Sequence, residues 1–172
     1  MAWINVIGGV AVLGSYAHGL LTHPATSGAV WGGVPEWLKP YYTVSMLAAA
    51  LGYFLFGYFL FFQVEPDKAR IASRFDFDLF NVLFVLILVP SAMWMPLTFR
   101  MLEAPNPGLW IAIRTVLATV GVASVLLIIA LVLLEPRRPT WAYGLAIAGS
   151  FAFALQTALL DALIWPAYFG DR

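Results

Sequence analysis

The chain alternates between long apolar runs and short connections rich in polar residues, glycine and proline. Five runs reach the roughly 20 residues that a helix needs to cross a bilayer. They cover residues 3–22, 41–64, 79–99, 107–134 and 141–166. Backbone polar groups at membrane depth must be paired within the segment, so each run predicts a helix. Because most connections are short, we expect an all-α integral membrane protein whose five helices run up and down as antiparallel neighbours.

The composition supports a membrane protein and argues against several other classes. The 172 residues are 62% hydrophobic and 10% charged, whereas soluble domains average about a quarter charged residues. This length leaves no room for a separate soluble module, so we expect a single domain over 1–172. The net charge is zero and no basic run exists, which predicts no nucleic-acid partner. With no cysteine and two histidines, the chain is not expected to require a metal or another cofactor.

Lysine and arginine are divided unequally between the two predicted faces. The face that carries the N-terminus holds Lys68, Arg70, Arg74, Arg137 and Arg138. The opposite face holds Lys39, Arg100 and Arg172. Positive residues favour the cytoplasmic side, so we expect the N-terminus to be cytoplasmic. No Lys or Arg precedes the first apolar run, and we therefore expect a retained helix there rather than a cleaved signal peptide.

Two charged residues lie well inside the predicted spans, namely Arg114 in the fourth and Asp161 in the fifth. A charge at bilayer depth is costly, so it usually pairs or marks a functional cavity. In antiparallel helices, Arg114 lies about two turns from the start of its helix and Asp161 about one turn from its exit. We expect them to share one depth, on the face opposite the N-terminus. A structural ion pair and a shared ligand both remain open.

The same face carries three further candidates. His18 lies near the end of the first span. It is either a hydrogen-bonded residue at the membrane interface or part of a binding site, where it would coordinate haem iron or form a hydrogen bond with a carboxylate of the ligand. Trp31 and Trp37 lie in the Gly/Pro-rich first connection. They either anchor that connection at the membrane interface or close it over the bundle as a lid.

Two stretches carry motifs with a specific pattern. Residues 91–99 read Ser-Ala-Met-Trp-Met-Pro-Leu-Thr-Phe, and residues 150–156 read Ser-Phe-Ala-Phe-Ala-Leu-Gln. These stretches resemble the Trp-x-Pro-Leu-Phe-Phe and Ser-Phe-Ala-x-x-Leu-Asn motifs of the TspO/MBR family, the tryptophan-rich sensory or translocator proteins. Ser91 and Gln156 stand where that family usually has asparagine. Only residues 38–40, Leu-Lys-Pro, match the family's signature in the first connection.

The resemblance implies a receptor or carrier of the bacterial cytoplasmic membrane, forming a homodimer. Its cavity, lidded by the first connection, would bind a hydrophobic tetrapyrrole or sterol-like molecule. A porphyrin, with propionates reaching Arg114 or His18, is the first candidate, and a sterol or hopanoid is the second. The expected ligand contacts are Trp31, Trp37, Ser91, Trp94, Arg114, Gln156, Asp161 and His18.

Two other functions stay open beside a receptor or carrier. The chain would be a structural or assembly subunit if Arg114 and Asp161 only join helices. It would be a membrane-embedded enzyme acting on a lipid or isoprenoid if Asp161 or His18 served as an acid or base. We consider an enzyme the less favoured function, because no paired carboxylates lie within the spans.

Overall fold

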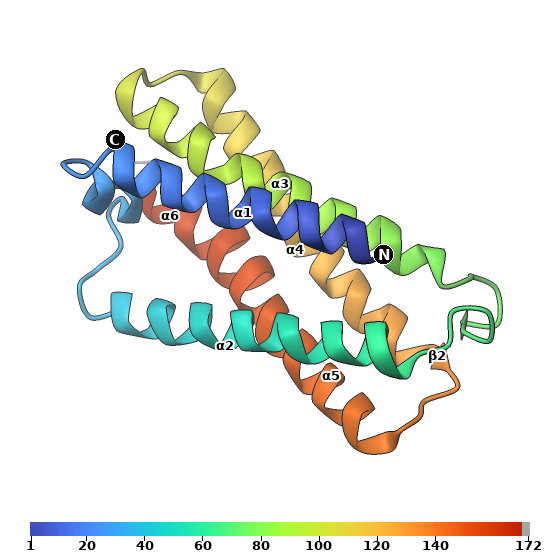
Figure 1. Ribbon diagram of the computed structural model, residues 1–172. Coiled ribbons are helices and arrows are strands. Elements are labelled where there is room, and N and C mark those ends of the chain that lie inside the picture. The colour runs from blue at the N-terminus through green and yellow to red at the C-terminus, as the bar shows by residue number, and fades with distance from the viewer. Residues whose placement is uncertain (170–172) are drawn as a thin grey trace.

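A computed structural model describes residues 1–169 and is built almost entirely of helices (Figure 1). Five segments are long and apolar enough to cross a membrane, which confirms the expected all-α bundle of five transmembrane helices. The first four are α1 (Ala2–Thr22), α2 (Lys39–Tyr58) with its continuation η2 (Phe59–Gln63), α3 (Asp78–Glu103) and α4 (Pro107–Val132). The fifth consists of α5 (Thr140–Ala154), η3 (Leu155–Ile164) and α6 (Trp165–Phe169).

The connections on the N-terminal side are joined by a short antiparallel ribbon. Its strands are β1 (Arg70–Ile71) in the second connection and β2 (Leu134–Glu135) in the fourth. Ile71 pairs with Leu134, and both side chains are buried. The ribbon therefore holds together two connections that carry five of the basic residues. The first connection, at the other end, contains the 3₁₀ helix η1 (Ser27–Trp31). Arg172, which we assigned to that end, lies outside the described residues.

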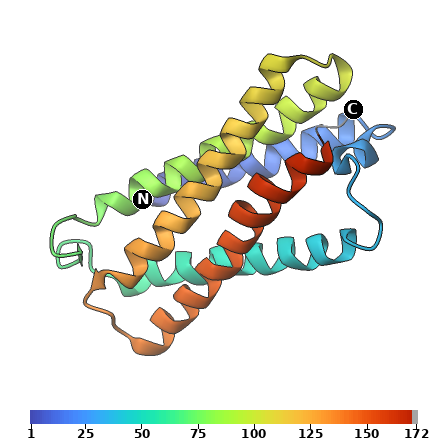
Figure 2. The same ribbon diagram turned by 180° about the vertical axis from the view of Figure 1, so that it is seen from behind.

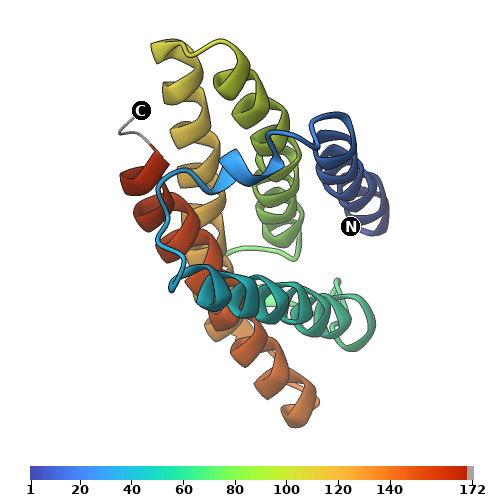
Figure 3. The ribbon, with the colours of Figure 1, turned by 90° about the vertical axis from the view of Figure 1, so that its left-hand side faces the viewer.

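The packing order of the helices differs from their order in the chain. α3 packs on α4 and α4 packs on α5 and η3, as short connections predict. However, α1 packs mainly on α3, and α2 packs mainly on α5. The connection between α1 and α2 is long enough to cross the end of the bundle, as Figure 3 shows. Its length allows these two consecutive helices to find different neighbours.

Close backbone contacts set both of these pairings. A Cβ atom added at Gly149 of α5 would lie 2.7 Å from the carbonyl oxygen of Gly52 in α2. A Cβ atom at Gly8 or at Gly19 of α1 would come within 2.7 Å of side chains of α3. Small residues let helix backbones approach in lipid, where dispersion contacts drive association. Glycine at these points thus determines which helix each partner contacts.

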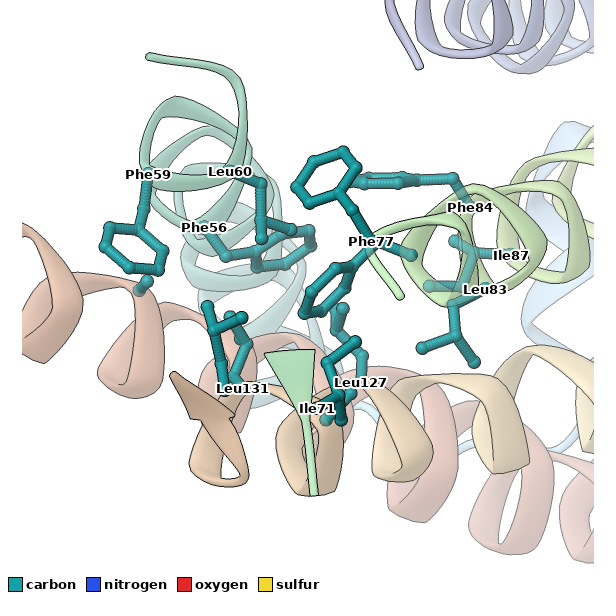
Figure 4. Close-up of a cluster of buried hydrophobic side chains, with 14 of the residues drawn as sticks. Phe56, Phe59, Leu60, Ile71, Phe77, Leu83, Phe84, Ile87, Leu127 and Leu131 are labelled. Carbon is teal, nitrogen blue, oxygen red and sulfur yellow. The ribbon is translucent and has the colours of Figure 1, made fainter. Parts of the chain in front are cut away.

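Buried apolar side chains form two clusters along the bundle. The larger cluster lies toward the N-terminal side and is rich in phenylalanine, including Phe56 and Phe84 (Figure 4). The smaller cluster, at the opposite end, contains Tyr42, Leu117 and Trp165. Residues of both clusters line a cavity in the bundle.

The α2–α5 contact makes a direct prediction about stability. Changing Gly149→Ala should lower the free energy of unfolding by about 1–3 kcal/mol, because the new methyl group overpacks the backbone contact. Unfolding in mixed micelles would measure this loss. The matched control is Gly144→Ala in the same helix, since a Cβ atom there meets nothing within 4 Å. Equal stability of the two variants would contradict a critical contact at Gly149.

The orientation remains a prediction that rests on the distribution of Lys and Arg. The chain has no cysteine, so single cysteines introduced at positions 30 and 70 report accessibility without background. With a cytoplasmic N-terminus, a membrane-impermeant maleimide added to intact cells should label position 30 and leave position 70 unlabelled. The reverse pattern would place the N-terminus outside.

Candidate functional site

The candidate site is a cavity of about 500 Å³ that is lined by all five membrane segments and by the first connection. Its walls are mostly apolar, a typical property of small-molecule sites. Six aromatic residues line it, namely Tyr16, Trp31, Tyr42, Trp94, Phe153 and Trp165. Its polar side chains also come from several elements and include Ser27, Ser91, Gln156, Thr157 and Asp161.

The π-helical geometry of η3 brings Gln156 and Asp161 together. Residues five apart in an α-helix lie about 140° apart around the axis. In a π-helix, by contrast, the i→i+5 hydrogen bond places such residues one above the other. Gln156 Nε2 accordingly donates to Asp161 Oδ1 over 2.7 Å. No pattern in the sequence indicates this widening of the helix, which creates the polar pair at the cavity wall.

Two buried polar atoms of cavity-lining residues have no hydrogen-bond partner within the described chain. They are Trp94 Nε1, a donor, and Gln156 Oε1, an acceptor. Gln156 is only 5% exposed, so bulk water does not serve its amide. Leaving a buried donor or acceptor unpaired costs about 1–3 kcal/mol. Two residues of the cavity wall therefore each carry one buried polar atom whose hydrogen-bonding capacity is unused within the described chain.

The first connection is fastened over this end of the bundle by the last helix. Trp165 Nε1 donates to the carbonyl oxygen of Val30 over 3.0 Å. The backbone N–H of Gly33 donates to the carbonyl oxygen of Tyr168 over 2.9 Å. Gly32 allows this close approach, because its φ is +61° and an added Cβ atom would lie 2.9 Å from the Cα of Phe169. The connection is therefore held in place by specific contacts to α6.

The cavity also reaches the lipid-facing surface between α1 and α2. These helices belong to different packing pairs, and their side chains join at Asn5, which accepts a hydrogen bond from the hydroxyl of Tyr53. Toward the first connection, Leu20 and Met46 both line the cavity and stay 46% and 41% exposed. The wall of the cavity between α1 and α2 therefore includes side chains that are exposed on the outer surface of the bundle.

The structure gathers five of the eight sequence-predicted site residues around this cavity, namely Trp31, Ser91, Trp94, Gln156 and Asp161. Their role in ligand binding stays a prediction. The other three do not line it. His18 is exposed on α1, and Trp37 is 68% exposed beside Tyr41. Arg114 lines a separate groove on the outer surface.

Of the two interpretations left open for Arg114 and Asp161, the structural ion pair is wrong. No salt bridge within 4.0 Å joins them among the ion pairs of residues 1–169. Arg114 shares a helix face with Ala118 and Gly121, by the i, i+4, i+7 spacing, whereas α4 lines the cavity with Val116, Leu117 and Val120. Position along a helix gives depth but not direction around the axis, and our argument used depth alone.

Sequence reasoning missed four aromatic residues of the site, namely Tyr16, Tyr42, Phe153 and Trp165. A tryptophan at the end of an apolar run is typical of an interfacial anchor, yet Trp165 is 4% exposed and holds the first connection. Its place one turn beyond Asp161 was the available signal. Tyr42 is also buried, and its hydroxyl donates to the carbonyl oxygen of Leu160.

Comparison with known proteins does not assign the chain to a family. No family model matches the chain, and neither the curated proteins nor the solved structures contain a similar one. The resemblance to the TspO/MBR family therefore stays a prediction that rests on the two short motifs.

The fastening of the first connection can be tested with Trp165→Phe, which keeps an aromatic ring and removes the donor to Val30. A cysteine replacing the buried Val34 should react about 3- to 10-fold faster with a water-soluble maleimide in this background, as expected from the loss of one hydrogen bond. Trp37→Phe, at an exposed position, is the matched control and should leave the rate unchanged. An unchanged rate in Trp165→Phe would show that this bond does not hold the connection.

Proposed function

We propose that this protein binds a lipophilic molecule with an uncharged polar group in the helix-lined cavity, acting as a membrane receptor or carrier. One observation carries the proposal: Trp94 Nε1 and Gln156 Oε1 are buried, unpaired and part of the same apolar cavity. A ligand that pairs with both atoms recovers the cost of burying them. This gives the cavity a preference for molecules with matching chemistry.

A hydroxyl group fits the free donor and acceptor. Its oxygen accepts from Trp94 Nε1, and its proton is donated to Gln156 Oε1. The aromatic walls suit a flat, rigid ring system, and each aromatic contact contributes about 0.5–1.5 kcal/mol beyond area burial. These features support a sterol-like or hopanoid-like polycyclic alcohol.

The charge of the cavity ranks this alcohol above a porphyrin. None of the described residues that line the cavity is Lys, Arg or His, and one is Asp161. A propionate placed there has no cation to meet and faces a carboxyl group. Arg114 and His18, which we expected to receive the propionates, lie outside the cavity. A tetrapyrrole thus becomes the second candidate for the same site.

The two other functions receive less support from the arrangement. Of the described lining residues, Tyr16 and Tyr42 are the only titratable partners for Asp161, and no hydrogen bond joins either to it. This does not favour acid/base catalysis. An assembly subunit has no need of a cavity that reaches the bilayer. The motif in α3 and the motif that spans the end of α5 and the start of η3 support a TspO-like protein, and with it a homodimer, as part of this proposal.

Trp94→Phe tests the proposal with little disturbance, because it removes a donor that makes no hydrogen bond within the described chain. Stability should be unchanged or slightly higher, while affinity for dehydroergosterol should fall about 10-fold, as expected for one lost hydrogen bond in a dry site. Energy transfer from tryptophan to this fluorescent sterol measures its binding. Trp3→Phe, at a position 77% exposed, is the control and should bind like the parent protein.

A ligand without the hydroxyl completes a double-mutant cycle. Competition by 5α-cholestane, which lacks the hydroxyl, should be weaker and insensitive to Trp94→Phe. An equal effect of Trp94→Phe on both ligands would exclude a hydrogen bond at this position. If only protoporphyrin quenches tryptophan fluorescence with saturation, the tetrapyrrole takes the place of the alcohol. Without saturable binding of either class, the structural-subunit function is favoured.

A further inference from the structure

A second hollow lies on the outer surface of the bundle, between α4 and η3, which run side by side (Figure 2). This groove has a volume of about 660 Å³. Small residues form its floor, including Ala118, Gly121 and Ala158. Gly121 permits the close contact of the two helices, because a Cβ atom there would lie 3.0 Å from the Cα of Ala158. The groove is thus a consequence of how α4 packs on η3.

Arg114 is the only charged residue among the described residues that line the groove. Its guanidinium makes no hydrogen bond, ion pair or ring contact with residues 1–169, whose four ion pairs all involve other side chains. The side chain is exposed. A cation within a membrane span strongly favours a partner, and this groove supplies none from the protein.

The position of Arg114 suits a lipid headgroup. It lies about two turns, or roughly 10 Å, from the start of α4 at Pro107. A long basic side chain at this depth extends toward the interface, where lipid phosphates lie. Below it, the floor of small residues leaves space for an acyl chain beside the exposed Val122 and Leu163.

We propose that this groove is a binding site for an anionic glycerophospholipid. The guanidinium of Arg114 donates two parallel hydrogen bonds to the phosphodiester, and one acyl chain lies along the groove. A zwitterionic lipid would add an ammonium group close to Arg114, with no carboxylate among the described groove residues to receive it. The net-anionic headgroup is therefore the better match in charge.

A second copy of the chain is a poorer occupant. Two copies meeting symmetrically through this groove would bury both Arg114 side chains in the interface. The described residues of the groove contain no Asp or Glu, so both arginines would stay unpaired in the interface. This would weaken the affinity between the two copies. Any homodimer should thus use another surface.

Native mass spectrometry of the delipidated protein in detergent tests the site. Dioleoylphosphatidylglycerol should be retained about 10-fold more strongly than dioleoylphosphatidylethanolamine, as one charge-assisted pair predicts. Arg114→Gln should abolish the difference. Arg100→Gln, which removes an exposed arginine at the end of α3, is the matched control and should preserve it. Ala118→Phe keeps the charge but fills the groove, and should also lower retention.

Three results would overturn the proposal. They are undiminished retention of the anionic lipid by Arg114→Gln, equal retention of the two lipids by the parent protein, and a disulfide between copies through Ala118→Cys in native membranes. The last would identify a second copy in the groove. Sterol binding provides an independent check, since Arg114→Gln should leave the cavity unchanged. Failure here and failure of the cavity proposal are therefore distinguishable.

Discussion

The close contact between α2 and α5 is the constraint on which much of the structure depends. In lipid, helices gain little from hiding apolar surface, so their pairing follows from how closely the backbones can approach. At Gly52 and Gly149 the backbones of the two helices come so close that an added Cβ atom at either glycine would meet backbone atoms of the other. Because α2 is committed to α5 and α1 to α3, the two pairs leave space between them. The cavity lies in that space, with the first connection across its end.

Local helix geometry then decides what chemistry the cavity contains. Regular α-helical turns would direct Gln156 and Asp161 to different sides, and the π-helical η3 places them on one wall. Direction around the helix axis also separates Asp161 from Arg114, because each lines a different hollow of the protein. One polar residue faces the interior of the bundle and the other faces the lipid, so we assign them to different ligands: a neutral alcohol inside and an anionic headgroup outside.

The sequence predicted the number, type and approximate ends of the spans, because length and hydropathy follow directly from bilayer thickness. For example, the fourth span was expected to begin at Pro107, and α4 begins there. Trp94 and Gln156 were singled out by a motif before the cavity was visible. Directions around helix axes were not predictable in this way. Arg114 was expected to lie near Asp161, and the burial of Trp165 was not foreseen, because apolar runs this uniform show no buried face.

The partners of α1 and α2 were also beyond sequence reasoning. Their pairing depends on contacts between residues far apart in the chain, such as Gly19 with Phe99. A short connection would have forced the two helices together, but the first connection is long. The large number of glycines in the chain did not distinguish those that contact a neighbour from those, such as Gly144, that contact nothing.

The opening between α1 and α2 has a consequence for how the protein samples the membrane. It lies toward the end with the first connection, and the hydrogen bond between Tyr53 and Asn5 bridges the helices toward the other end. The two leaflets are therefore not equivalent for this protein. Under the proposed function, a ligand that enters through this opening would come from one monolayer, and one dissolved in the other would first have to cross the bilayer. Occupancy would then report the composition of a single leaflet.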